Sequence, residues 1–387
     1  MKDNVDTILQ QKQVTVNDLD NYAQRLREQY KPYFENLTLK IKREGTAELT
    51  ERGSVPCSLE IHTVPRNSHP QFSVFLGTSS KANATMSVGN LLGRAESLNI
   101  IAETSSMEKK WTFSFNAPTV KFLKNTSFGT GIYKDTSIVT EKDHYSEVTK
   151  GITASLSKDS HSLNYDLKHI DVSLTKDISE ATLNEGGSHI KSSLTYQFTS
   201  KIQFLSTKSK VIVEYAGLGG DAKYLKPIIN IKSLLFSLGK WKLKLFTKLG
   251  GIFSLGTRTF ISDRFFLGGL RSFRGFEEKG VGPRGKRDPY GGNLFYHFTL
   301  LLQYPLFSKF NGQLFLEMGD LINNEISWLR RPTLDKNLFD QMRITSGVGI
   351  SFKINNMMNF SLYYCLPIRT QPTDLLRSWE WGVTTDI

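Results

Sequence analysis

The chain lacks the long apolar runs of a helical membrane protein. Hydrophobic residues make up 39% of its 387 positions, and no run approaches the roughly 18–20 consecutive apolar residues of a spanning helix. Such hydropathy is usual for soluble proteins. It is also usual for membrane barrels, because their strands alternate lipid-facing with lumen-facing residues and so dilute the average. The missing runs therefore exclude a helical membrane protein. A soluble protein and a membrane β-barrel both remain open.

The chain also has few residues arranged for catalysis or metal binding. Its two cysteines, Cys57 and Cys365, are too few for a disulfide framework. Seven histidines are scattered without HExxH or paired-Cys spacing, and no nucleophile elbow occurs. The glycines at 217–220 are not a phosphate loop, because no Lys-Ser/Thr pair follows them. We expect a protein that is not an enzyme and has no metal, cofactor or nucleic-acid partner.

The N-terminus lacks the usual targeting signals. Residues 1–6 are acidic and contain neither an apolar signal core nor an Arg-rich amphipathic presequence. We expect any targeting information to be internal. The whole chain is basic: 49 Lys and Arg against 37 Asp and Glu give a net charge of +12. The excess of basic residues has two interpretations. They lie in solvated loops, or they attract anionic lipid and acidic partners.

Residues 1–66 differ from the rest in their periodicity. Asn17 is suited to cap a helix, and four apolar residues recur at helical spacing after it: Leu19, Tyr22, Leu26 and Tyr30. Pro32 ends that pattern. Two strand-like runs follow at 37–43 and 58–64, so the predicted order is helix, strand, strand.

From residue 67 onward the chain is a series of alternating strands. We predict sixteen, at 71–78, 84–90, 97–105, 109–118, 126–137, 146–157, 161–174, 188–200, 210–219, 224–238, 241–255, 293–306, 312–321, 341–354, 358–368 and 378–387. Most have about the 9–11 residues that a tilted strand needs to cross a bilayer. The predicted fold is an all-β membrane protein, a sixteen-stranded antiparallel transmembrane β-barrel.

Alternation within single strands indicates which side chains face the lumen. In 341–354 an apolar face, including Ile344 and Val348, opposes a polar face that includes Arg343. In 312–321, Glu317 lies on the face opposite Leu314 and Leu316 and is predicted to point into the lumen. A water-soluble sandwich would show the same period, but so many strand residues would more often divide into domains.

The longest connection between strands, at 256–292, has an unusual composition. At about 36 residues it is far longer than a hairpin loop of 2–5. Its many Phe, Leu and Gly residues allow it to pack on itself, which argues against disorder. Arg274 stands between Phe273 and the Gly275-Phe276 pair, so its charged side chain is expected to be buried when these phenylalanines pack. A buried cation needs a hydrogen-bonded partner of opposite charge.

Three spaced blocks in this connection carry a family resemblance: Arg264-Phe-Phe-Leu-Gly-Gly269, Phe273-Arg-Gly-Phe276 and Gly280-Val-Gly-Pro283. Together they resemble the inward-folded sixth loop of the outer-membrane barrel insertases. Within that superfamily, to which the bacterial BamA is related, the chain most resembles the central barrel of the mitochondrial sorting and assembly machinery. Further matches lie at 90–96, 314–321, 347–350 and 363–367, so the resemblance covers the chain from about residue 60 to its end.

The resemblance implies a domain organisation and a function. Residues 1–66 resemble the tail of a polypeptide-transport-associated (POTRA) domain, in an abridged form. Residues 67–387 form the barrel, with the loop 256–292 folded inward. The implied function is insertion of β-barrel precursors into the mitochondrial outer membrane, with the N-terminal domain in the intermembrane space. The implied partners are precursor barrels, accessory subunits of the sorting and assembly machinery, and the phospholipid bilayer.

The resemblance also implies a lumenal site. Its loop motif is Phe273, Arg274, Gly275 and Phe276, and Glu317 is the expected partner of Arg274. Arg343 is predicted to be lumenal as well and to compete for the same carboxylate. The alternative interpretation of Glu317 is a solvated acid in the lumen.

The second predicted site is a lateral gate between the first and last barrel strands. Its first-strand residues are Phe72, Ser73, Val74, Phe75, Leu76 and Gly77. Its last-strand residues are Glu380, Trp381, Gly382, Thr385 and Ile387, which resemble the mitochondrial β-signal except at Thr385, where a larger apolar residue is expected. The resemblance implies that the last strand of a client pairs with the first strand by β-augmentation. The alternative is an ordinary final strand.

Two other functions remain open at this point. One is a barrel of the same superfamily that translocates polypeptides, which the loop motif does not exclude. The other is a passive metabolite porin, which has no evident use for a long loop that carries Arg274.

Overall fold

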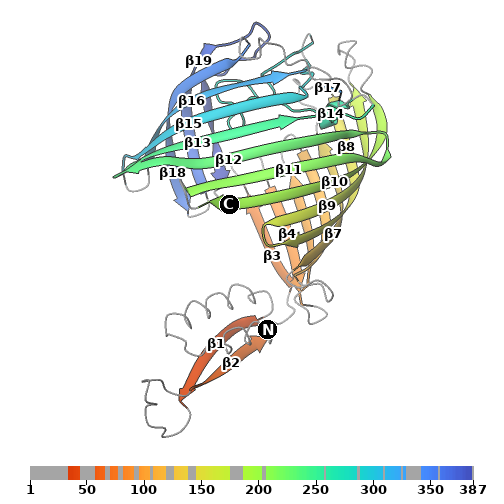
Figure 1. Cartoon of the computed structure of the whole chain (residues 1–387), viewed down its shortest axis with the longest axis vertical. Coiled ribbons are helices and arrows are strands. Elements are labelled where there is room, and N and C mark those ends of the chain that lie inside the picture. The colour runs from red at the N-terminus through yellow and green to blue at the C-terminus, as the bar shows by residue number, and fades with distance from the viewer. Residues whose placement is uncertain are drawn as a thin grey trace.

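The computed structural model describes residues 34–43, 57–65, 70–76, 82–90, 96–104, 108–118, 126–137, 145–174, 186–202, 206–256, 259–285, 288–307, 310–323, 326–327, 341–355 and 358–385. The predicted helix at 17–30 lies outside these residues. Both predicted strands of the N-terminal region are present, as β1 (Phe34–Arg43) and β2 (Cys57–Pro65), and they pair as a separate two-stranded antiparallel sheet (Figure 1). No helix of the described residues is long and apolar enough to cross a membrane.

The rest of the chain closes into one barrel (Figure 1). Its long strands are β3 (Pro70–Leu76), β4 (Ala82–Gly89), β5 (Ser97–Thr104), β6 (Glu108–Ala117), β7 (Ser127–Ser137), β8 (Tyr145–Lys158), β9 (His161–Leu174), β10 (Gly187–Ile202), β11 (Thr207–Gly220), β12 (Tyr224–Leu238), β13 (Trp241–Gly251), β15 (Leu294–Pro305), β16 (Phe310–Ile322), β18 (Arg343–Asn355), β19 (Met358–Arg369) and β20 (Trp379–Thr385). Each pairs antiparallel with the next along the chain, so the prediction of a sixteen-stranded antiparallel barrel is confirmed.

One predicted strand is broken in the structure. The run predicted at 241–255 ends at Gly251, and a two-residue strand, β14 (Phe253–Ser254), follows it. Ile252 leaves the ladder and donates its N–H to Asn293. β14 then pairs with β12 and, in parallel, with the short β17 (Ile326–Ser327). The barrel wall is therefore already irregular where the long loop begins.

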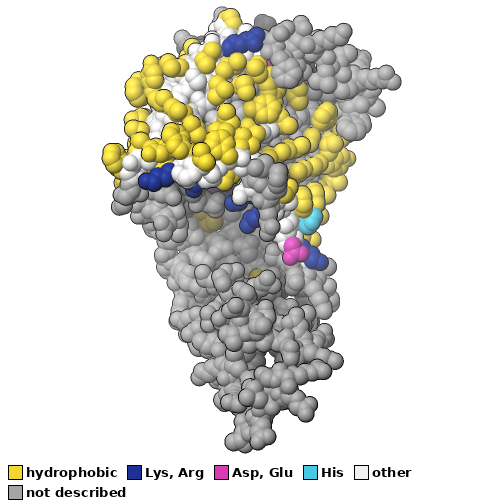
Figure 2. All heavy atoms as spheres, turned by 60° about the vertical axis from the view of Figure 1, so that its left-hand side comes forward, with side chains coloured by type: hydrophobic (Ala, Val, Ile, Leu, Met, Phe, Trp, Pro, Cys, Tyr) yellow, Lys and Arg dark blue, Asp and Glu magenta, His cyan; other side chains and the backbone are white. Residues whose placement is uncertain are grey.

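The alternation of the strands separates a lipid-facing surface from a lumen. Side chains such as Trp111, Ile132 and Val348 are more than half exposed on the outside. Hydrophobic side chains cover the wall, and Lys and Arg side chains gather mainly near its edges (Figure 2). On the other face, Glu317 and Thr345 are buried, so this barrel has its buried polar groups inside and its apolar groups outside, as a membrane barrel requires.

The wall is not of uniform height. The strands from β8 to β12 have 14, 14, 16, 14 and 15 residues. β3, β4 and β5 have 7, 8 and 8 residues, and β20 has 7. The barrel is therefore low on both sides of the junction between its first and last strands.

The first and last strands of the barrel meet at that junction. The strand order places β20 beside β3. β20 is in register with β19 from Trp379 to Thr385, and β3 with β4 from Pro70 to Leu76. β20 and β3 are hydrogen-bonded to each other across this junction, so the barrel is closed. We call this junction the seam.

Candidate functional site

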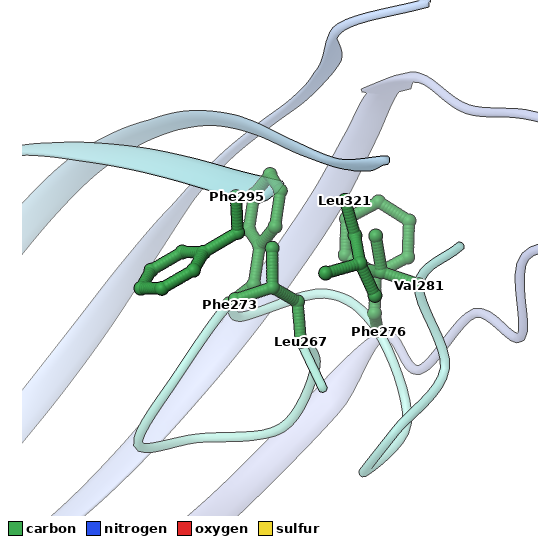
Figure 3. Packing of buried hydrophobic residues seen from close by; sticks show 6 residues of the cluster. All are labelled: Leu267, Phe273, Phe276, Val281, Phe295 and Leu321. Carbon is green, nitrogen blue, oxygen red and sulfur yellow. The ribbon is translucent and has the colours of Figure 1, made fainter. Parts of the chain in front are cut away.

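The loop between β14 and β15 is folded into the barrel and packed by its own side chains. Phe273 and Phe276 are fully buried, with ring centroids 4.9 Å apart. They form one cluster with Leu267 and Val281 of the loop and with Phe295 and Leu321 of the wall (Figure 3). A cluster of this kind fixes the backbone of the loop by apolar burial. The loop is thus a structured insert in the lumen.

Within this insert, Arg274 contacts Glu317 of β16. Its Nη2 lies 2.6 Å and its Nε 2.7 Å from Glu317 Oε1, and its backbone N–H donates to Oε2 at 2.7 Å. The guanidinium also lies over the rings of Phe315 and Tyr363, at 4.0 and 4.7 Å. The predicted placement of Glu317 in the lumen and its contact with Arg274 are both present. A buried cation held by two hydrogen bonds to one carboxylate oxygen and by two aromatic faces is fixed in position.

Glu317 has further neighbours on β15. Thr299 Oγ1 lies 3.4 Å from its Oε1, and His297 Nε2 lies 3.5 Å from its Oε2. His297 also packs against the ring of Phe273. The carboxylate is therefore fully occupied, as a charge that is only 3% exposed requires.

Gly275 allows the loop to approach the wall closely. Its φ is +90°, a region that favours glycine, and a Cβ there would lie 3.0 Å from Thr345 Cγ2 and 3.4 Å from Cys365 Cβ. Its N–H donates to Glu380 Oε1 of β20 at 3.0 Å. The Arg-Gly pair of the motif is therefore bound to two carboxylates, one on β16 and one on the last strand.

The loop makes further contacts with β20 and the segment before it. Backbone hydrogen bonds join Glu277 N to Leu375 O, Leu375 N to Gly280 O and Arg377 N to Gly275 O. A Cβ on Gly382 would lie 2.6 Å from Leu270 of the loop. Glu380 and Gly382, the polar residue and the glycine of the predicted β-signal, thus both face the loop.

Arg343 does not compete for Glu317, so that prediction is wrong. Its guanidinium contacts Asp320 and also lies 3.0 Å from both carboxylate oxygens of Asp374. Asp374 Oδ1 in turn accepts from the N–H of Gly282 in the loop at 3.4 Å. Arg343 therefore pairs with the nearer carboxylates of Asp320 and Asp374. Through Asp374, which accepts from Gly282, it supports the loop.

The remaining predicted gate residues lie as follows. Phe72 to Leu76 are in β3, where their backbone pairs with β4. Trp381 is 55% exposed on the outer face of β20. Thr385 is the last residue of β20, and Gly77 and Ile387 lie outside the described residues. The functional role of each of these residues stays a prediction.

A second anchor of the loop was not predicted from the sequence. Asp263, at the end of the 3-10 turn η2 (Ile261–Asp263), accepts from Lys191 Nζ at 2.5 Å and from Tyr224 Oη at 2.7 Å. Lys191 is also 2.8 Å from Glu214. Burial alone would raise the pKa of Asp263, but the charge of Lys191 and its hydrogen bonds hold that pKa below the ordinary value. This cluster fixes the start of the loop to β10, β11 and β12.

The described residues hold no group of His, Cys, Asp and Glu arranged to bind a metal ion. Three lumenal carboxylates, Glu317, Asp320 and Asp374, are paired with Arg274 and Arg343. Such an arrangement holds a loop in place, and the chemistry it offers is hydrogen bonding and charge pairing.

Comparison with known proteins gives one family. The Omp85 superfamily domain matches residues 90–387. Sorting and assembly machinery component 50 homologs are similar in sequence: that of Xenopus tropicalis is 29% identical over 313 residues, which cover 74% of this chain and 65% of the relative. The homolog of Homo sapiens is 29% identical over 319 residues, with the same coverage. The chain thus spans less than two thirds of the length of these curated relatives.

The fold is also found among solved structures. BamA from Haemophilus ducreyi lacking POTRA domains 1–3 superposes with a TM-score of 0.74 at 18% identity, covering 96% of this chain and 79% of that one. CdiB from Acinetobacter baumannii superposes with a TM-score of 0.54 at 14% identity, covering 96% and 68%. At these identities the similarity concerns the fold.

Proposed function

Because this chain belongs to the Omp85 superfamily, we propose that it is a barrel insertase, which pairs the last strand of a precursor barrel with β3 at the seam and so assists its folding into the mitochondrial outer membrane. The observation that carries this proposal is the unequal fixing of the two seam strands. β20 is held by the loop as well as by its strand partners, whereas β3 meets β20 with a strand of only seven residues.

Contacts between the lumenal face of β20 and the loop hold this strand in place. Gly275 donates to Glu380, Leu270 fills the space above Gly382, and Arg377 just before the strand donates to Gly275 O. When the seam opens, β20 therefore stays with the loop and the wall from β16 to β19. β3 is the strand that moves and offers its edge.

The edge of β3 suits strand addition. Its seven residues run from Pro70 to Leu76, and Pro70 has no N–H to donate. A short ladder of few hydrogen bonds parts at smaller cost than a long one. The exposed backbone groups of an opened strand are costly in a bilayer, so the incoming strand of a client satisfies them by β-augmentation. Because backbone groups do the pairing, many client sequences are accepted.

The low wall assists the same step. β3, β4 and β5 have fewer than the roughly 9–11 residues that a strand needs to span a bilayer. A short apolar segment is matched by local thinning of the lipid. A polar client turn then crosses less hydrocarbon beside β3 than beside β10. The free energy comes from folding of the client, and no cofactor or covalent step enters.

A photo-crosslinking experiment tests the proposal. A photoreactive residue at Ser73 of β3 should form an adduct with a stalled precursor barrel that has its last strand. The matched control is the same residue at Ser162 of β9, which is registered with both β8 and β10. Equal adducts from both positions, or an adduct at Ser73 with a precursor that lacks its last strand, would overturn the proposal.

We also place the N-terminal sheet β1–β2 in the intermembrane space. An even number of strands puts both ends of the barrel on one side of the membrane, and the family resemblance supports the intermembrane space as that side. Protease added to intact mitochondria should leave residues 34–65 uncut until the outer membrane is ruptured. Cleavage there before rupture would contradict this topology.

A further inference from the structure

The outer wall of β6 to β10 has a groove of about 740 Å³. Most of its lining is hydrophobic side chains that face outward, among them Trp111, Ile132 and Ile152, which are 59%, 56% and 54% exposed. Lys134, Lys150 and His169 line it as well. The mechanism at the seam uses none of these residues.

The strand registers arrange these residues in two parallel rows. Trp111 pairs with Lys134, Lys134 with Lys150, and Lys150 with His169. These four side chains lie side by side on the outer face and form what we call the basic row. Neighbouring strands are about 4.8 Å apart, so the three cationic or ionisable groups span roughly 10 Å.

The second row is apolar and lies two residues further along each strand. Phe113 pairs with Ile132, Ile132 with Ile152, and Ile152 with Leu167. All four are exposed on the same outer face as the basic row. The groove therefore has hydrocarbon along its floor and positive charge at one end.

The basic row lies at the expected depth of a lipid headgroup. On β8 the outward positions from Ile152 to Leu156 are apolar, with Lys150 at one end and Lys158 at the other. At about 3.3 Å per residue, the eight residue steps from Lys150 to Lys158 cover roughly 26 Å along the strand. With strands tilted by about 35–45°, this length corresponds to roughly 19–22 Å along the membrane normal, slightly less than the apolar band of about 25 Å of a membrane barrel. Lys150 and its row thus meet the polar boundary on the side of the loops that join β7 to β8 and β9 to β10.

We propose that this groove binds an anionic phospholipid, with its phosphate on the basic row and an acyl chain along the apolar row. Charge complementarity selects this occupant: Lys109, Lys134 and Lys150 are exposed on this part of the outer face, where Asp171 pairs with His169 at 3.4 Å and offsets at most one charge. The headgroup of a zwitterionic lipid carries its own positive charge, which is repelled by the basic row, so such a lipid binds there less favourably. The site is independent of the gate and requires only that the barrel is in a membrane.

The groove contains its own reporter, Trp111. In a variant with the other four tryptophans replaced by Phe (Trp241, Trp328, Trp379 and Trp381), fluorescence quenching by lipids with brominated acyl chains reports which lipid lies at the groove. The probe is a phosphatidylcholine vesicle in which either phosphatidylglycerol or an equal fraction of phosphatidylcholine is brominated. Quenching should be stronger with brominated phosphatidylglycerol, with enrichment of roughly five-fold per lysine near the phosphate.

Two double variants test the assignment at equal net charge. Lys134→Gln with Lys150→Gln should abolish the excess quenching. Lys158→Gln with Lys242→Gln, which removes two exposed lysines elsewhere, should preserve it. Circular dichroism melting of both variants establishes that the barrels are folded. Equal quenching by the two brominated lipids, or loss of the excess in both variants alike, would overturn the proposal.

Discussion

The wall from β8 to β12 and the wall on either side of the seam differ about two-fold in strand length. The former has strands of 14–16 residues and the latter strands of 7–8. Each ladder hydrogen bond contributes about 0.5–1.5 kcal/mol net, so a pair with half the bonds is several kcal/mol easier to part. In the proposed function, the tall wall is permanent and the short wall is the one that opens.

The loop connects these two regions and is bound differently in each. Asp263 fixes its start to β10, β11 and β12, and Arg274 with Gly275 fixes its middle to β16 and β20. The loop thereby ties the last strand to the tall wall through the lumen. The predictions below weaken each tie in turn.

The largest effect is expected from Arg274→Ala. Breaking a buried ion pair costs roughly 3–5 kcal/mol, and water in the lumen should lower this figure. The loop should become accessible to thermolysin and client assembly should fall, while most of the barrel stays folded. Arg271→Ala, an exposed arginine of the same loop, is the control and should change neither readout. Equal protection of the loop in both variants would show that the pair does not hold it.

Gly275→Ala should have the next largest effect. It places a Cβ at φ +90° against Thr345 and Cys365, and such strain costs about 1–3 kcal/mol. Gly256→Ala has similar backbone strain, at φ +105°, but open space around it. The free energy of unfolding should therefore fall further for Gly275→Ala. Equal losses of unfolding free energy in the two variants would mean that close packing at Gly275 contributes nothing to stability.

Asp263→Ala should have a moderate effect at the other anchor. It removes one partner of Lys191, which keeps Glu214, so we expect a loss of about 1–3 kcal/mol. Loop protection should fall near residues 259–265 more than near 274. Glu278→Ala, an exposed acid of the same loop, is the control. Loss of protection confined to the Arg274 region would contradict a separate anchor.

The smallest effect is expected from Glu380→Gln. The amide oxygen still accepts from Gly275 N–H, so the change in unfolding free energy should stay within about 1 kcal/mol. Client assembly should be nearly unchanged, whereas Glu380→Ala should reduce it. If Glu380→Gln were as harmful as Arg274→Ala, then the negative charge at this position, and not the hydrogen bond, would be what matters.

Alternation and one motif made much of this architecture predictable. The period of two identified the strands and put Glu317 in the lumen, because the opposite face of β16 carries Leu314 and Leu316. An arginine between phenylalanines required a buried acceptor, and Glu317 was the acid on a lumenal face. The strands and their lumenal faces came from local sequence alone, whereas the inward fold of the loop and the pairing of Arg274 with Glu317 came from the family resemblance.

Contacts between distant segments were not predictable in the same way. Lys191 and Asp263 are 72 positions apart, and nothing local to either indicates a partner. Arg343 was given the wrong acceptor because Asp374 lies in a connection whose path no periodicity describes. Irregular segments determine which of several lumenal charges meet, and the strand pattern carries no information about them.

Lateral opening of the seam is the central claim, and a disulfide across it is the most direct test. In a Cys57→Ser, Cys365→Ala background, Val74→Cys in β3 is combined with cysteine at Trp381 or Val383 in β20, and the pair that oxidises completely is used. The control is Ser155→Cys with Asn164→Cys, a registered pair of β8 and β9. We expect oxidation at the seam to block assembly of client barrels and reduction to restore it, with the control unaffected in either state. Full assembly with the seam disulfide completely formed would contradict lateral opening between β3 and β20.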